Sequence, residues 1–293
     1  MIGPREIHER ACRAFGQPRN PRATRELRFG RKGSVSVVLD GPKAGLWYDF
    51  EDGRGGTLLD IDEMPDRPHR PPARRAREPI DRPEQRHAVE AMLARITSVE
   101  GSPGEVYLRG RGISRWPHSI RFLPNPLALA CLAQDLSGAV RAIQRIYLRA
   151  DGSRGSIMVA GVETRKTTHA TCDGWHEIAA VRMPGRGLPI LCEGVETGLS
   201  IWMATGRPVC ACLGNAGFDS LYVRGKSVCI ARDGDRPGSK ADKRIGRALD
   251  ARCRTHRVLV ATPPVAMDFN DAHQAHGLDE VASIIKGAKS WQP

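Results

Sequence analysis

Between residues 187 and 293, four short apolar runs alternate with segments of helical spacing. The runs are PILC at 189–192, PVCAC at 208–212, SVCIA at 227–231 and RVLVA at 257–261. The segments between and after them fit helices at about 195–204, 218–223, 239–253 and 279–286. Continuous apolar strands that alternate with helices are typical of a parallel sheet covered on both faces. The sequence therefore predicts an α/β domain with a parallel four-stranded sheet flanked by helices.

Acidic residues follow two of these runs. Glu193 comes directly after the first run, and Asp233 and Asp235 follow the third run as Asp-Gly-Asp. Ligands of open parallel sheets bind beyond the carboxyl ends of the strands, so we expect the three side chains at one edge. Converging carboxylates repel one another unless a cation neutralises them, and oxygen ligands suit Mg²⁺ or Mn²⁺. The sequence predicts a divalent-metal site here, and the alternative is a loop of solvated acids.

The charge of the chain indicates a polyanionic partner. Lys and Arg number 45 and Asp and Glu 33, which gives a formal charge of +12. A charge of this sign favours nucleic acid. No segment approaches the roughly 18–20 apolar residues of a membrane helix, so we expect no membrane span. The charged N-terminus and the eight scattered cysteines predict a cytoplasmic protein with reduced thiols.

The rest of the chain divides by composition into three segments. Residues 1–64 hold a hairpin pattern, with β-rich runs at 34–39 and 46–50, a tight glycine turn at 51–56 and a helical candidate at 57–64. Residues 65–86 are rich in Pro and Arg, which predicts a flexible linker. Residues 87–186 predict a mixed α+β subdomain that begins with a helix at 88–96. Residues 187–293 are the expected catalytic domain.

Two motifs in the last segment resemble those of the Toprim domain, which bacterial-type primases, topoisomerases and some nucleases share. They are Cys192-Glu193-Gly194 and the stretch from Arg232 to Ala241, which contains Asp-Gly-Asp. The resemblance implies that Glu193 serves in acid–base or metal chemistry and that Asp233 and Asp235 bind Mg²⁺ or Mn²⁺. The stretch Met267–Asp271 is similar to an acidic Toprim segment, which implies that Asp268 holds a second metal ion.

The segment upstream resembles the catalytic core of DnaG-like primases. The likeness is carried by residues 107–113 (YLRGRGI), 120–124 (IRFLP) and 142–148 (AIQRIYL). It implies a basic track for template or nucleotide phosphates, and the expected contacts are Arg111, Arg145, Lys166 and Lys240. The alternative is that these are ordinary surface cations.

The N-terminal segment resembles the second half of a primase zinc ribbon, at residues 47–56 (WYDFEDGRGG). Asp49 and Asp52 stand where the ribbon would carry cysteines, and carboxylates do not replace thiolates in a structural zinc site. We therefore expect a module without zinc. Trp47 and Tyr48 either contact DNA or pack the hairpin.

These features predict a DNA primase that copies single-stranded DNA from nucleoside triphosphates in phage- or plasmid-type replication, with a helicase or initiator as a possible recruiter. The alternatives are a Toprim nuclease and a non-catalytic protein that binds single-stranded DNA. A helicase motor is not expected, because Gly225-Lys226-Ser227 lacks the first glycine of a P-loop. His169, Cys172 and His176 have no fourth ligand nearby in the sequence, so we do not expect them to bind a metal ion.

Overall fold

The computed structural model describes residues 3–30, 33–49, 54–58 and 82–292. The chain forms two compact units, Met1–Arg75 and Ala76–Pro293, which are described separately. Of the predicted linker 65–86, residues 65–81 lie outside the described residues, and Pro83 already begins a helix. The linker prediction was therefore wrong at its C-terminal end. No helix in the described ranges is both long and apolar enough to cross a membrane.

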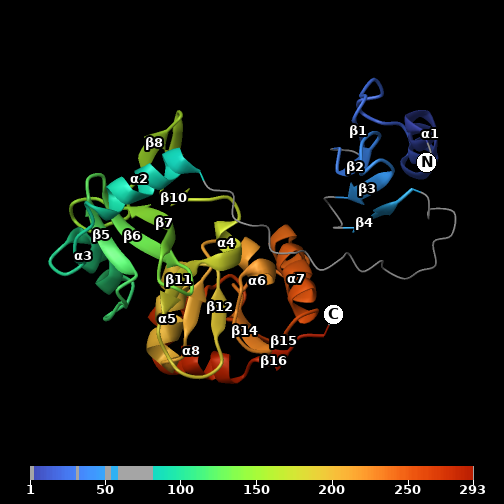
Figure 1. Ribbon diagram of the computed structural model, residues 1–293. Helices are drawn as coiled ribbons and strands as arrows, with labels where there is room; N and C mark the ends of the chain where they lie inside the picture. Colours follow the sequence, from blue (N-terminus) through green and yellow to red (C-terminus); the bar gives the residue numbers. More distant parts are fainter. Residues whose placement is uncertain (1–2, 31–32, 50–53, 59–81, 293) are drawn as a thin grey trace. The chain divides into compact units, whose positions relative to one another are not determined.

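The N-terminal unit is a four-stranded antiparallel sheet packed against one helix (Figure 1). Its elements are α1 (Pro4–Phe15), β1 (Glu26–Phe29), β2 (Val35–Val38), β3 (Leu46–Asp49) and β4 (Arg54–Thr57). The β2–β3 pairing confirms the predicted hairpin. The glycine turn at 51–56 was wrong in part, because residues 54–56 belong to β4. The helix predicted at 57–64 begins inside that strand, and residues 59–64 lie outside the described residues.

Trp47 is a core residue of this unit. Its ring lies 5.1 Å from that of Phe15, and it packs with Leu27, Phe29 and Val37. Tyr48, the next residue along the strand, is exposed on the other face. Trp47 therefore packs the hairpin, which is one of the two roles that the sequence left open for it. Asp49 ends β3, and Asp52 lies outside the described residues.

The larger unit is built on one ten-stranded mixed sheet, in the order β10-β7-β6-β11-β13-β12-β14-β15-β16, with β5 paired to β6. The strands are β5 (Ile120–Pro124), β6 (Leu127–Gln134), β7 (Val140–Tyr147), β10 (Lys166–Ala170), β11 (Ala180–Met183), β12 (Ile190–Cys192), β13 (Val209–Ala211), β14 (Ser227–Ala231), β15 (Arg257–Ala261) and β16 (Lys289–Ser290). Pairing is parallel from β13 through β12 and β14 to β15. The predicted four-stranded parallel sheet is confirmed.

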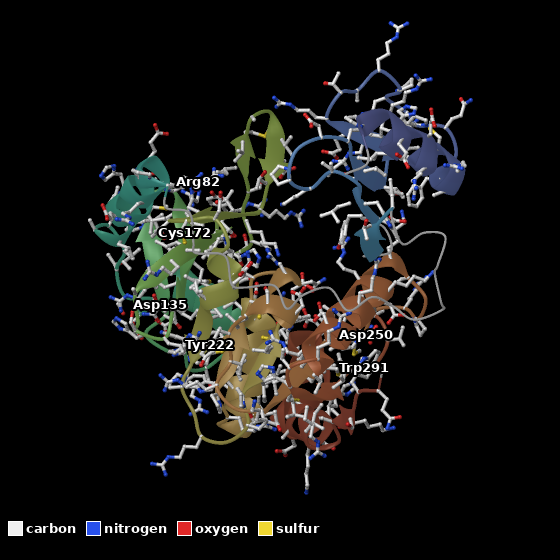
Figure 2. All side chains as sticks on the ribbon, turned by 45° about the vertical axis from the view of Figure 1, so that its right-hand side comes forward. Arg82, Asp135, Cys172, Tyr222, Asp250 and Trp291 are labelled. Atoms are coloured by element: carbon white, nitrogen blue, oxygen red, sulfur yellow. The ribbon has the colours of Figure 1, made fainter. Side chains whose placement is uncertain are left out.

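Helices cover both faces of this sheet (Figure 1). They are α2 (Pro83–Leu93), α3 (Pro103–Gly110), α4 (Trp175–Ile178), α5 (Val195–Thr205), α6 (Ala216–Ser220), α7 (Lys240–Cys253) and α8 (Phe269–Lys286). Residues of α3, α5 and α8 share one buried cluster, and residues of α6 and α7 share another. At the sheet edge, the indole nitrogen of Trp291 donates a 2.8 Å hydrogen bond to Asp250 on α7 (Figure 2).

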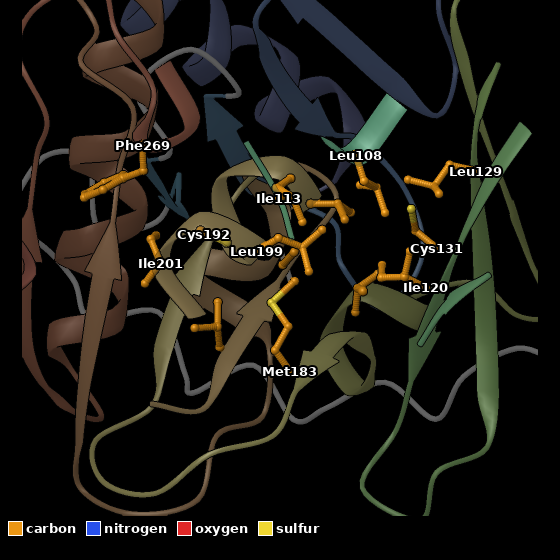
Figure 3. Close-up of a cluster of buried hydrophobic side chains, with 14 of the residues drawn as sticks. Leu108, Ile113, Ile120, Leu129, Cys131, Met183, Cys192, Leu199, Ile201 and Phe269 are labelled. Atoms are coloured by element: carbon orange, nitrogen blue, oxygen red, sulfur yellow. The ribbon is translucent and has the colours of Figure 1, made fainter. Parts of the chain in front are cut away.

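One core runs through the segments predicted as separate, 87–186 and 187–293. Strand β11 pairs with β6 on one side and with β13 on the other, both antiparallel. Figure 3 shows Leu108 and Leu129 of the first segment in the same cluster as Leu199 of the second. The position of the parallel strands is therefore fixed relative to the segment 87–186 that precedes them.

Candidate active site

Acids at the carboxyl ends of two adjacent strands, β12 and β14, lie at one edge of the sheet. Cys192, which ends β12, pairs with Ala231, which ends β14, and Ala231 pairs with Ala261 at the end of β15. Glu193 directly follows β12, and Asp233 comes two residues after β14. Because parallel strands in register end together, their following residues emerge side by side.

Asp268 is brought to the same place by the start of α8. It is the N-cap residue of this helix, where its carboxylate accepts a 2.8 Å hydrogen bond from the backbone N–H of Asp271. The Asp271 carboxylate in turn accepts a 3.1 Å hydrogen bond from the backbone N–H of Asp268. This reciprocal capping box holds both carboxylates at the positive end of the helix dipole.

Gly234 lets the loop before α8 dock on the Asp-Gly-Asp segment. Its N–H donates to the Met267 carbonyl at 2.8 Å, and its own carbonyl accepts from the Ala266 N–H at 2.7 Å. A Cβ atom at this position would lie 2.1 Å from the Pro264 carbonyl oxygen. Only glycine permits so close an approach of two backbones. The middle residue of the motif therefore brings Asp268 beside Asp233.

The environment of Asp233 disfavours its charged form. Burial, reinforced by the negative charges of Glu193, Asp268 and Asp235, raises the pKa of Asp233 to about 7. Its Oδ1 atom is buried and has no hydrogen-bond partner among the described residues. A buried carboxylate oxygen without a partner is costly, and a bound cation would satisfy it.

The pKa values of two neighbouring acids, Glu193 and Asp268, are also raised. Burial raises the pKa of Glu193, against the opposing charge of Lys166. Burial likewise raises the pKa of Asp268, which the positive charge of Arg111 partly offsets. The site therefore combines carboxylates that repel one another with cations close enough to moderate that repulsion.

A pocket of about 300 Å³ opens between the Asp-Gly-Asp segment and the loop that precedes α8. It is lined by residues 233–236 and 266–268. Within the described residues, no three His, Cys, Asp or Glu side chains already stand as a complete metal-binding group. The oxygen donors and the orphaned Asp233 oxygen nevertheless fit a hard divalent cation such as Mg²⁺ or Mn²⁺. That Glu193, Asp233 and Asp235 share one ion remains a proposal.

The four cations expected from the sequence do not all lie at this site. Arg111 acts electrostatically on Asp268, and Lys166 acts on Glu193. Lys166 pairs with Ile146 across the β10–β7 ladder, whereas Arg145 pairs with Thr167. Successive strand residues point to opposite faces, so Arg145 and Lys166 lie on opposite sides of the sheet.

Arg145 contacts other side chains on its own face of the sheet. Its guanidinium lies 2.6 Å from the His169 Nε2 and 5.3 Å from the centroid of the Tyr147 ring. Tyr147 belongs to the cluster that packs under α2. Lys240, the remaining expected contact, is exposed at the first residue of α7.

Three residues of the site were missed by the sequence analysis. Arg244, one helical turn after Lys240 on α7, lowers the pKa of Glu193, and Asp271 raises that of Asp233. Asn270 is fully buried and donates a 2.9 Å hydrogen bond to the Arg111 carbonyl, which anchors the backbone at that arginine. The signal that the sequence offered for Asn270 and Asp271 is their place in the stretch Met267–Asp271, which resembles an acidic Toprim segment.

Comparisons with known proteins agree with this architecture. Residues 189–279 match the Toprim domain, and residues 83–176 match a domain of unknown function (DUF7146). No protein of curated function matches the sequence. The chain contains a Toprim domain, as the motifs around Glu193 and Asp233 predicted.

Among solved structures, the chain is similar to DnaG-type primases. The Aquifex aeolicus primase, with zinc-binding and RNA polymerase domains, has a TM-score of 0.51 at 14% identity, over 99% of this chain and 87% of that one. A primase domain from Pseudomonas aeruginosa has a TM-score of 0.45 at 15% identity, over 71% of this chain and 79% of that one. At 14% identity the likeness to the Aquifex aeolicus structure concerns the fold alone, and it agrees with a primase-like fold around the Toprim domain.

Proposed function

We propose that this Toprim-domain protein is a DNA primase, a nucleotidyltransferase that makes short primers on single-stranded DNA. The observation that carries the proposal is the buried Oδ1 atom of Asp233, which has no hydrogen-bond partner among the described residues and lies beside Glu193 and Asp268. A cluster that is unfavourable for stability and open to a pocket is typical of a functional site. The primase-like fold around it supports nucleotidyl transfer as the reaction.

Glu193, Asp233 and Asp235 would hold a divalent ion, and Asp268 would contribute to a second one. Such ions neutralise charge on a triphosphate and on the transferring phosphoryl group. Asp233, whose pKa is about 7, exchanges its proton near neutral pH, so it is ready to accept either a proton or a cation. Glu193 is the candidate to accept the proton of the attacking hydroxyl.

Positive side chains surround this acidic centre. Lys166 and Arg244 face Glu193 from β10 and α7, and Arg111 faces Asp268 from the end of α3. We assign to them the nucleotide phosphates, because cations on three different elements can contact the separate phosphates of one triphosphate. Arg145 and Lys240 are proposed as contacts to more distant parts of the DNA strand.

A primer synthesis assay on a single-stranded template tests the proposal, with nucleoside triphosphates and Mg²⁺ or Mn²⁺. Wild type should yield short products, and Asp233→Asn combined with Asp235→Asn should abolish them. Asp279→Asn, an exposed acid on α8, is the matched control and should leave synthesis intact. Metal-dependent degradation of DNA without any need for nucleotides would indicate a nuclease instead. Binding of single-stranded DNA that persists without either reaction would indicate a non-catalytic accessory protein.

A further inference from the structure

A small hairpin separate from the main sheet stands out from the larger unit. It consists of β8 (Ile157–Val159) and β9 (Val162–Thr164), which pair antiparallel and join no other strand among the described residues. The turn is Ala160-Gly161, with φ of 48° and 80°. Two consecutive positive φ values are typical of the tight two-residue turns that match strand twist. Figure 1 shows the hairpin projecting beyond α2.

The tip of this hairpin is apolar and exposed. Met158 is 66% exposed, Val162 64% and Val159 42%. Three of the nine large hydrophobic side chains exposed in the described part of the chain thus lie on this one short element. Apolar side chains gathered on a protruding tip indicate contact with another molecule.

The root of the hairpin is firmly attached. The Tyr147 N–H donates to the Arg165 carbonyl at 3.0 Å, and the Tyr147 carbonyl accepts from the Gly155 N–H at 2.8 Å. Ile157 packs against the buried cluster under α2. Both legs are therefore fixed to the end of β7, and the tip is held at a defined distance from it.

Both strands of the hairpin join the rest of the unit beside the acidic centre. Arg154, before β8, places its guanidinium 3.8 Å from the Glu196 carboxylate on α5. Lys166, after β9, acts electrostatically on Glu193. Each strand of the hairpin has three residues, which span about 10 Å from the root to the tip at the usual rise of a strand. The apolar tip thus stands within a few nucleotides of the proposed reaction site.

The charges at the base of the hairpin indicate which kind of molecule binds its tip. Arg149, Arg154, Arg165 and Lys166 are all exposed there. The acids near these cations already accept hydrogen bonds. Glu163 accepts one of 2.6 Å from the Ser156 hydroxyl, and Asp151 accepts one from the backbone N–H of Ser153. Cations below an apolar tip match a polynucleotide, whose phosphates meet the cations while its bases meet the apolar side chains.

The geometry points to the β8–β9 hairpin as a wedge that packs Met158 and Val162 against bases of the DNA strand next to the acidic centre. The contact unstacks those bases and fixes the position of the strand. This inference rests on the proposed function for its biological sense, but it concerns binding, which is measured without nucleotides.

The test uses the full chain and a single-stranded oligodeoxynucleotide that carries 2-aminopurine, a base whose fluorescence rises when it unstacks. Met158→Ser with Val162→Ser removes the two most exposed apolar side chains of the tip and leaves every charge in place. Leu136→Ser is the matched control, an exposed apolar residue in the turn at the opposite end of the β6–β7 hairpin. Thermal unfolding verifies that all variants remain folded.

Wild type and Leu136→Ser should bind the oligonucleotide equally and raise its fluorescence. The tip variant should bind about tenfold more weakly and lose the fluorescence change. The salt dependence of binding should stay the same, because no phosphate contact is removed. Wild-type affinity in the tip variant, or no binding by wild type, would overturn the inference and leave a protein partner as the occupant of the tip. A tip effect in a protein that makes no primers would instead refute the proposed function alone.

Discussion

Replacing Asp233 by asparagine should make the metal-free protein more stable while it abolishes metal binding. The wild-type carboxyl has a pKa of about 7 in the fold, against the ordinary aspartate value of 3.8 that applies to the unfolded chain. Asparagine keeps the shape of the side chain but carries no charge. The variant therefore isolates what the ionised form of Asp233 costs the fold.

The sign and size of the effect follow from proton linkage. Between pH 4 and 7 the unfolded chain has released a proton that the folded protein keeps, so wild-type stability falls as pH rises through this range. A shift from 3.8 to about 7 predicts a loss of about 2.6 kcal/mol between pH 5 and pH 8. Asp233 is only partly buried, and water that reaches it reduces this figure to on the order of 1–2 kcal/mol.

Urea unfolding in EDTA at pH 5 and pH 8 measures this difference. The gain of Asp233→Asn over wild type should grow with pH, whereas the exposed control Asp279→Asn should show no such trend. Added Mn²⁺ should then stabilise wild type at pH 8 and leave Asp233→Asn unchanged, because only the folded wild type binds the ion. An equal gain at both pH values, or a loss of stability at pH 8, would refute the electrostatic account of the site.

Two further substitutions test how the site is built. Gly234→Ala places a methyl group against a carbonyl oxygen of the facing loop, and it should destabilise the protein by more than about 2 kcal/mol and weaken Mn²⁺ binding. Gly246→Ala on α7 meets no atom within 4 Å and should stabilise it by about 0.5–1 kcal/mol in the same urea titration. Tyr107→Phe removes the 2.7 Å hydrogen bond from the Tyr107 hydroxyl to Glu196 and should cost about 1.5–3 kcal/mol. Tyr222→Phe, at an exposed tyrosine, is the control and should leave the stability measured by thermal unfolding unchanged. An equal loss of stability in both variants would contradict the role of the Tyr107–Glu196 hydrogen bond.

The parallel sheet and the position of its acids were predictable from the sequence for a physical reason. Strands buried on both faces have few polar residues, so they stand out as apolar runs between helices. Once four such runs are recognised, the rule for strand ends places Glu193, Asp233 and Asp235 at one edge without further information. The match of residues 189–279 to the Toprim domain confirms the predicted fold, and the role of these three acids stays a prediction.

Features that depend on non-local pairing were not predictable. Nothing in residues 180–183 shows that β11 pairs with β6 and β13 and so joins the two predicted subdomains. The separation of Arg145 from Lys166 follows from the β7–β10 register, which single strands do not reveal. Helix α1 was missed although Ile7, Ala11 and Phe15 recur at helical spacing.

The two glutamates near the start of α5 show why proximity in sequence does not decide function. Glu193 precedes the helix and shares its surroundings with Lys166 and Asp235. Glu196 lies in the first turn and accepts the Tyr107 hydroxyl from α3, so it ties the upstream segment to the Toprim domain. One acid carries the proposed chemistry, and its neighbour holds the two parts of the site together.

The acidic centre is held in place by backbone rather than by attraction among its own side chains. Its carboxylates repel one another, and the Asp233 Oδ1 has no partner among the described residues. The strand pairing of β12, β14 and β15, the two hydrogen bonds at Gly234 and the capping box at Asp268 position the acids through contacts within the chain. These contacts offset a repulsion that a bound cation would remove. Because the clustered charges disfavour folding, cation binding is the role that we propose for them.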